Sequence, residues 1–264
     1  MKSKSETRKH GMSSRFCLTL LVAAVVALAA PQAVAQSSSN EWQFAIAPYA
    51  WLAGMDGSMT IGGHEAGDAS VDFDHIIDSL DFVFMGHFDM RNEHWVISSD
   101  LLFLDLGGSR DSADGDGSEG TVSTGFDTTL FEVVGGYRVS PAVTLLAGAR
   151  LVDMGMSIDL EGPLEDRRVD ASKSFVDPLV GVHVFAPLSE KWWFGFRGDV
   201  GGFGVGSELT WQAYADIGFR ISHLVSVLAG YHILDMDYES DTDVVTADLD
   251  MTVSGPQLAV VFTF

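Results

Sequence analysis

The histidines and the acidic residues are the side chains of this sequence that could do chemistry, and they are spread widely along it. Beyond the N-terminal region, the histidines are His64, His75, His87, His94, His183, His223 and His232. A serine hydrolase needs a serine, a histidine and an acid that converge on one point, but no nucleophile motif adjoins any of these histidines. The spacing therefore gives no indication of hydrolysis, and we expect that the protein is not an enzyme.

Two short motifs are similar to known binding loops without matching them. Residues 202–206 (GFGVG) have the glycines of a dinucleotide loop, but they lie in a strand-like pattern and no helix follows. Residues 114–118 (DGDGS) lack the glycine at position six and the distal glutamate of a calcium loop. We therefore predict no cofactor. For the acidic loops, a weak divalent-cation role stays open beside a purely solvated surface.

The elements that carry the charged residues alternate between polar and apolar positions. From Leu80 to Met90 the even positions are apolar, whereas the odd positions include Asp81, His87 and Asp89. Such a strand fits a soluble sandwich, but it also fits a membrane barrel whose apolar face meets lipid and whose polar face meets the lumen. The length of the segments favours the barrel, because strands that cross a bilayer need about 9–11 residues.

Ten segments of this kind predict an all-β, antiparallel, up-and-down transmembrane β-barrel of about ten strands. Eight strands would require one hairpin to be loop, and twelve would require a hairpin hidden in residues 54–79. The connections are mostly short and long in turn, which is typical of bacterial outer-membrane barrels and places both termini on the short-turn, periplasmic side. Within residues 72–80, helical spacing of apolar residues predicts a short amphipathic turn at the barrel mouth. The predicted segments are 42–53, 80–91, 94–106, 122–138, 142–156, 174–186, 191–205, 209–220, 224–238 and 250–264.

The lumen face of these strands carries charges of both signs. An isolated charge in a narrow lumen is costly to desolvate, so charges there must pair. We expect a structural ion-pair network that fills the interior, with a polar path for ions or small solutes as the alternative. Arg91, Arg138 and Arg220 adjoin short turns and are expected to anchor the periplasmic interface. The deeper candidates are Glu132, Arg150, Asp177, Arg197, Asp199 and Asp216.

The N-terminus has the features of an exported protein. A basic region is followed by an apolar run at 16–30 and by an Ala-x-Ala site at 33–35, which predicts a signal peptide of residues 1–35 and a barrel domain of residues 36–264. The predicted leader contains five of the 15 basic and one of the 37 acidic residues, so the mature chain would carry a net charge of −26 instead of −22. Such a charge repels phosphate, and we predict no nucleic-acid partner.

The C-terminal residues alternate up to the last position. Leu258, Val260, Phe262 and Phe264 have the pattern of the signal that the outer-membrane barrel insertion machinery reads, and an ordinary terminal strand would not account for an aromatic final residue. Aromatic residues beside the short turns indicate an interfacial girdle, and Tyr49 and Trp51 would mark the opposite rim. The girdle candidates are Trp42, Trp95, Tyr137, Trp192, Trp193 and Phe219.

Several motifs resemble those of a widespread, uncharacterised family of proteobacterial outer-membrane β-barrel proteins. They are PYAWL at 48–52, GDVGGFGVGS at 198–207, Trp211-Gln212, Gly230-Tyr231, Asp237-Tyr238 and Gly255-Pro256. Family members often have Arg where this chain has His232. The resemblance implies the fold and the location but no substrate.

Together these features predict an outer-membrane protein of a Gram-negative bacterium with a structural or surface-interaction role and a plugged lumen. A narrow, porin-like channel for small solutes or cations is the alternative. An outer-membrane enzyme is the least favoured interpretation. A barrel protease of the Asp/His type would need paired acids and a histidine at the extracellular rim; acids are abundant there, but in a mature chain with a net charge of −26 their abundance is weak evidence. The expected partners are outer-membrane lipid, lipopolysaccharide, the insertion machinery and divalent cations at acidic loops.

Overall fold

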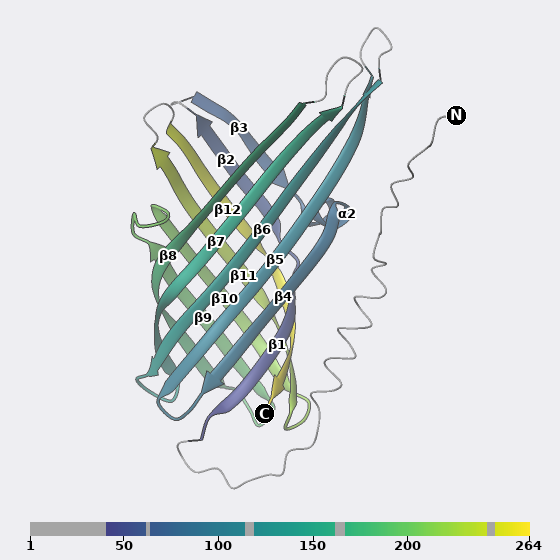
Figure 1. Ribbon diagram of the computed structural model, residues 1–264. Coiled ribbons are helices and arrows are strands. Elements are labelled where there is room, and N and C mark those ends of the chain that lie inside the picture. The colour runs from purple at the N-terminus through teal and green to yellow at the C-terminus, as the bar shows by residue number, and fades with distance from the viewer. Residues whose placement is uncertain (1–40, 62–63, 114–118, 162–166, 242–245) are drawn as a thin grey trace, which may run out of the picture. The chain divides into compact units, whose positions relative to one another are not determined.

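The computed structural model describes residues 41–61, 64–113, 119–161, 167–241 and 246–264 (Figure 1). The predicted signal peptide and the DGDGS motif lie outside these residues. The described chain forms twelve strands and one short helix, α2 (Phe73–Asp78). No helix among the described residues is long and apolar enough to cross a membrane. The strands are β1 (Gln43–Trp51), β2 (Gly54–Ile61), β3 (His64–Val71), β4 (Leu80–Arg91), β5 (Trp95–Ala113), β6 (Glu119–Arg138), β7 (Val143–Glu161), β8 (Arg167–Pro187), β9 (Trp192–Gly202), β10 (Leu209–Arg220), β11 (Val225–Asp241) and β12 (Thr246–Thr263).

The sheet is antiparallel and closes on itself, which confirms the predicted barrel of ten strands. The order is β1-β4-β5-β6-β7-β8-β9-β10-β11-β12, and β12 pairs with β1 to complete the circle. At the closure, the backbone N–H groups of Phe44 and Phe264 donate to each other's carbonyl oxygens at 3.2 and 2.8 Å. Four short turns and the C-terminus lie at one end, the turn end, in the lower part of Figure 1; the opposite end is the loop end.

A hairpin does lie within residues 54–79, but it adds no strand to the circle. β12 pairs with β1 through Tyr49–Ala259 and with β2 through Met55–Val253, and the register is unbroken between them. β1 and β2 are therefore two parts of one barrel strand, interrupted at residues 52–53. β3 pairs with β2 at the loop end, and α2 then leads into β4. The expected short helix is present, although none of its residues is buried.

The predicted segments leave loops at 107–121, 157–173 and 239–249. Each is wrong in part, because residues 107–113, 157–161 and 239–241 continue β5, β7 and β11 as strand. Their partner strands are extended to match, and Figure 1 shows β5 to β8 projecting far at the loop end. Residues 107–113 (GGSRDSA) have almost no apolar side chains, so no alternation marks them as strand, whereas residues 157–161 (SIDLE) keep the alternation. The backbone pairing continues through both segments. β9 is shorter than predicted and ends at Gly202, because Gly202, Phe203 and Gly204 have φ of 87°, 53° and 70° and turn the chain.

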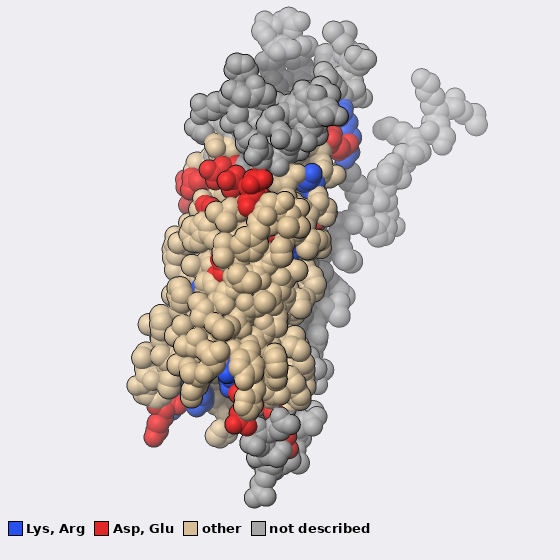
Figure 2. Space-filling model, turned by 90° about the vertical axis from the view of Figure 1, so that its left-hand side faces the viewer, with Lys and Arg blue, Asp and Glu red and all other residues tan. Residues whose placement is uncertain are grey.

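Large apolar side chains on all ten barrel strands face outward and are exposed. They include Phe44, Phe88, Ile97, Phe131, Leu145, Val180, Trp192, Ile217, Tyr231 and Leu258. On the face shown in Figure 2 the resulting broad band has few charged side chains, and acidic residues gather beyond it on the loop side. An exposed apolar band around a closed barrel is the surface that hydrocarbon requires.

The aromatic girdle is formed by some of its predicted members but not by all. Trp95 packs edge-on against Tyr137 with ring centroids 5.0 Å apart, and both rings are exposed beside a short turn. Trp193 instead points inward and lies over Gly218, where a Cβ would be 2.1 Å from the indole ring. Tyr49 and Trp51 also point into the lumen, so neither marks the outer rim.

Candidate functional site

Charged side chains of the lumen lie in one row across neighbouring strands. His87 of β4 is opposite Asp100 of β5, which is opposite Glu132 of β6. The row continues through Arg150 of β7 to Asp177 of β8. Residues directly opposite each other in a sheet are close enough for their side chains to interact. The register of five strands therefore assembles the polar groups of the lumen.

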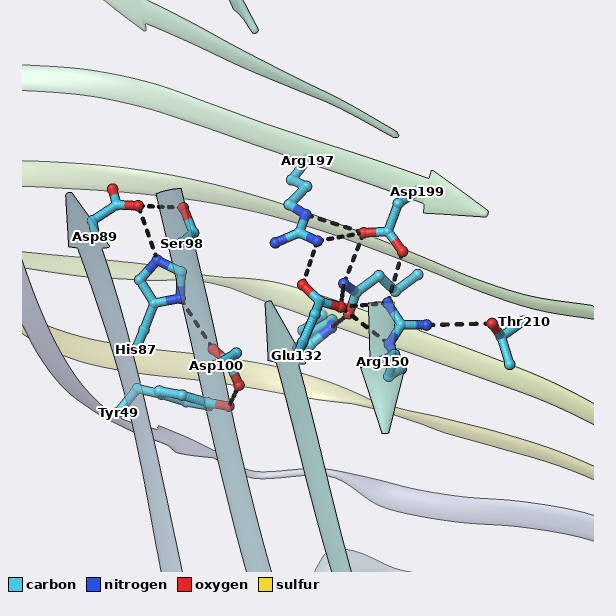
Figure 3. Close-up of polar contacts among 12 residues, drawn as sticks. Tyr49, His87, Asp89, Ser98, Asp100, Glu132, Arg150, Arg197, Asp199 and Thr210 are labelled. Carbon is cyan, nitrogen blue, oxygen red and sulfur yellow. Dashed lines mark hydrogen bonds and ion pairs between the residues drawn. The ribbon is translucent and has the colours of Figure 1, made fainter. Parts of the chain in front are cut away.

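Four of the predicted charges form one buried cluster, shown in Figure 3. Arg150 donates from Nε and Nη2 to Glu132 Oε2 at 3.1 and 2.8 Å, and from Nη2 to Asp199 Oδ1 at 2.7 Å. Arg197 donates from Nε to Asp199 Oδ2 at 3.0 Å and from Nη2 to Glu132 Oε1. Gln212 Nε2 donates to both carboxylates, at 3.0 and 2.8 Å. Two positive and two negative charges thus neutralise each other, and all four carboxylate oxygens accept hydrogen bonds.

This ion-pair cluster, defined as Glu132, Arg150, Arg197 and Asp199, crosses the lumen. Glu132 belongs to β6 and Arg197 to β9, and two strands separate them in the wall. The Arg150 side chain has no exposed surface, and those of its partners are exposed by 4% or less. The cluster therefore fills the β6–β10 side of the lumen at this level and leaves little charged surface there for a passing ion.

The other two predicted members of the lumen network, Asp177 and Asp216, bind residues outside the ion-pair cluster. Asp177 accepts hydrogen bonds from the Ser207 backbone N–H and Oγ, both at 2.8 Å, and from Thr210 Oγ1 at 3.3 Å. It therefore fixes the β9–β10 turn and forms no ion pair with an arginine of the described residues, although Arg150 is its neighbour in register. Asp216 accepts a hydrogen bond from Gln257 Nε2 at 2.6 Å.

An apolar layer lies on the loop side of the ion-pair cluster. On strand after strand, the inward residue two positions nearer the loop end is apolar: Leu130 follows Glu132 in this direction, and Val152 follows Arg150. Among the described residues this layer has members on every barrel strand except β9 and β10, and it packs as one cluster. Its buried members are Trp51, Ala53, Leu102, Val152, Phe175, Leu234, Met236 and Met251.

A cavity of about 460 Å³, the turn-side cavity, opens at the turn end and extends beside the cluster, whose Glu132 and Arg197 are part of its lining. Leu102, Leu130 and Leu234 close its inner end, where the apolar layer begins. Its lining reaches the turn end at Gln43 and Thr263, the first residue of β1 and the last of β12. Next to β6, β7 and β8, a small apolar cluster of Val134, Leu146 and Leu179 occupies the lumen instead.

A chain of hydrogen bonds follows one wall of this cavity (Figure 3). Tyr49 Oη donates to Asp100 Oδ1 at 2.7 Å, and His87 Nδ1 is 3.1 Å from Asp100 Oδ2. On its other side, His87 Nε2 is 3.6 Å from Asp89 Oδ1, which also accepts a hydrogen bond from Ser98 Oγ. Because Ser98 contacts a carboxylate and not the imidazole, this chain does not have the geometry of an activated serine.

Sequence reasoning missed the inward aromatic residues of this site. Trp51 stacks on His232 with ring centroids 4.2 Å apart, and its indole N–H is buried without an acceptor among the described residues. The signal that could have placed it is the parity of β1, where Phe44 and Ile46 are apolar and face outward. Trp51 has the opposite parity, like Ala45 and Ala47, and lies inside.

Metal-binding groups are not gathered among the described residues: no group of three or more His, Cys, Asp or Glu side chains there could hold a metal ion. The inward histidines His87, His183 and His232 all line the turn-side cavity. None of these three lies at the loop end.

Comparison with solved structures identifies the fold. The outer membrane protease OmpT from Escherichia coli matches with a TM-score of 0.55 and 10% identity, over 87% of this chain and 99% of that chain. The translocator domain of autotransporter NalP from Neisseria meningitidis matches with a TM-score of 0.43 and 14% identity, over 95% and 96% of the two chains. The attachment invasion locus protein Ail of Yersinia pestis gives 0.33 and 11%, over 84% and 98%.

The chain thus has the closed ten-strand antiparallel fold of outer-membrane β-barrels. No protein-family model matches the sequence, and no curated protein matches it as a relative. The likeness to an uncharacterised proteobacterial family therefore stays a prediction, whereas the barrel fold does not depend on it.

Proposed function

We propose that this chain is an integral outer-membrane protein of a Gram-negative bacterium with a non-conducting lumen and a structural or surface-interaction role. The observation that carries the proposal is that the apolar layer closes the inner end of the cavity, while the ion-pair cluster fills one side of the lumen next to it. The charges of the ion-pair cluster are paired with each other, and the apolar layer on its loop side offers an ion no ligands. Barrels of about eight strands are only wide enough to be filled by side chains, and ten strands add little room.

We also propose that the turn end and both termini face the periplasm. Two features support this orientation. Bacterial outer-membrane barrels have short turns on the periplasmic side, and here the four short turns are all at one end. Outward-facing acids lie on the loop side of the apolar band, and Asp237 is directly opposite Asp250 there. Phosphates of lipopolysaccharide would require divalent cations to approach such a surface, so these are the partners we propose for it.

The final strand is the proposed target of the barrel-insertion machinery. Leu258 and Val260 face outward on β12, and Phe264 is exposed and hydrogen-bonded to Phe44 at the closure. A hydrolytic role has little support. OmpT is named a protease, but that likeness is one of fold, and the serine and histidine of the wall chain do not touch.

Conductance in a planar bilayer tests the proposal. The full chain is refolded, its insertion is verified by the change in gel mobility on heating, and a conducting porin serves as the control for the bilayer. We expect no single-channel steps from this chain. Reproducible cation-selective steps would instead establish the narrow channel. Recovery of the native protein in the soluble periplasmic fraction would refute every membrane role.

A further inference from the structure

The turn-side cavity has the size and lining of a ligand site. Its volume of about 460 Å³ lies within the range of about 300–1,000 Å³ typical of small-molecule pockets. Aromatic side chains line it at two levels: Tyr49 and Tyr214 near its inner end, Phe185 and Trp193 nearer the mouth. A rigid barrel wall holds all of these groups, so the pocket exists before any ligand enters.

The inner part of the cavity presents carboxylates. Asp216 has a single hydrogen-bond donor among the described residues, Gln257, which binds Oδ1 and leaves Oδ2 available. Asp100 keeps 24% of its side-chain surface exposed where it lines the cavity, and Asp89, two residues from Arg91 and so nearer the mouth, keeps 26%. The nearby Arg197 already forms ion pairs with Glu132 and Asp199 and forms none with these carboxylates. Carboxylate oxygens that are exposed to the cavity, or that, like Asp216 Oδ2, accept no hydrogen bond from the described residues, can bind an ammonium group, which has three donors and no acceptor.

The mouth of the cavity has the opposite charge. Arg91 and Arg220 are the last residues of β4 and β10 and line the cavity at the turn end. Arg220 Nη1 donates to the Glu190 carbonyl oxygen at 3.3 Å, and neither guanidinium is within ion-pair distance of a carboxylate among the described residues. A guanidinium without a carboxylate partner is suited to bind an anionic group of a ligand.

We propose that the cavity binds a small zwitterion in which an ammonium and a carboxylate are joined by a short carbon chain. The ammonium would lie inward, toward Asp216 and Asp100, and the carboxylate at the mouth, toward Arg91 or Arg220. The aromatic side chains between the two levels pack against the linking carbons. A simple anion would be repelled by the inner carboxylates and a simple amine by the arginines, so only a molecule with both charges matches both ends. This inference does not depend on whether the lumen conducts.

Calorimetric titration of the refolded full chain in detergent tests the proposal with three probes of one carbon length. They are 4-aminobutanoate, butylamine and butanoate. We expect 4-aminobutanoate to bind at least tenfold more tightly than either single-charge analogue. Equal binding of butanoate and 4-aminobutanoate would overturn the proposal in favour of an anion site at the mouth. Absence of binding by all three at 20 mM probe would overturn it altogether.

Two variants assign the ends of the ligand. Asp216→Asn preserves shape and leaves the ion-pair cluster intact, and we expect it to weaken 4-aminobutanoate and butylamine about tenfold, as for one lost charged hydrogen bond, without affecting butanoate. Arg91→Gln is expected to weaken 4-aminobutanoate and butanoate but not butylamine. Asp153→Asn, at an exposed acid outside the cavity, is the matched control. If both cavity variants bind like this control, the proposed site is wrong; gel mobility before and after heating shows that each variant is folded.

Discussion

The two halves of the lumen are built by the same ten strands but have opposite interiors. On the loop side the inward residues are apolar and pack against each other as a core. On the turn side many are polar, and they surround a cavity. The ion-pair cluster is the boundary between these halves, since Glu132 and Arg150 directly precede the apolar residues Leu130 and Val152 in the direction of the loop end. The difference teaches that strand alternation determines only which residues face inward. Whether the interior is apolar or polar at a given height depends on the inward residues that the strands place at that height.

Removal of Arg150 should have the largest effect, because it breaks the boundary. Arg150→Ala leaves Glu132 and Asp199 buried with too few partners, and loss of one member of a buried ion pair costs about 3–5 kcal/mol. We expect a loss of this size in the free energy of unfolding, measured by urea titration in lipid vesicles. Arg168→Ala is the control, because Arg168 forms ion pairs with Asp159 and Asp170 while 62% of its side chain is exposed. An equal unfolding midpoint for Arg150→Ala and the wild type would contradict the structural role of the cluster.

Truncation within the apolar layer tests whether the loop-side half is a true core. Leu234 is 3% exposed, and Leu→Ala in a packed core costs about 3 kcal/mol. Leu234→Ala is therefore expected to lower the free energy of unfolding by this amount in the same assay. Leu258→Ala, at an outward position that is 53% exposed, removes the same atoms and should cost less. If the two variants are equally destabilised, the layer is no better packed than the lipid-facing surface.

The smallest effect is expected in the turn-side half, where water reaches the polar groups. Tyr49→Phe removes the hydroxyl that donates to Asp100, and one hydrogen bond contributes about 1 kcal/mol. Tyr231→Phe is the matched control, because its hydroxyl lies on the outer face and contacts Ser254 at 3.3 Å. A loss for Tyr49→Phe as large as that for Arg150→Ala would show that the turn-side half is as tightly built as the boundary.

The barrel itself could be predicted from the sequence, because lipid imposes an apolar outer face on every strand that crosses it. The strand extension at 107–113 could not, since this segment (GGSRDSA) has almost no apolar side chains and shows no period. The extension at 157–161 (SIDLE) does alternate, and its interpretation as a loop was wrong. The inward charges were recognisable as a set. Their pairing was not, because Arg150 is opposite Asp177 in register yet binds Asp199 of β9.

The ion-pair cluster also has a mechanical consequence. A thin-walled tube bends most easily by flattening, in which two opposite walls approach and the other two separate. Arg197 on β9 and Gln212 on β10 donate hydrogen bonds to Glu132 on β6 and so tie together walls that are not neighbours. Such cross-bracing holds the cross-section of the barrel round where lateral pressure from the bilayer acts on it.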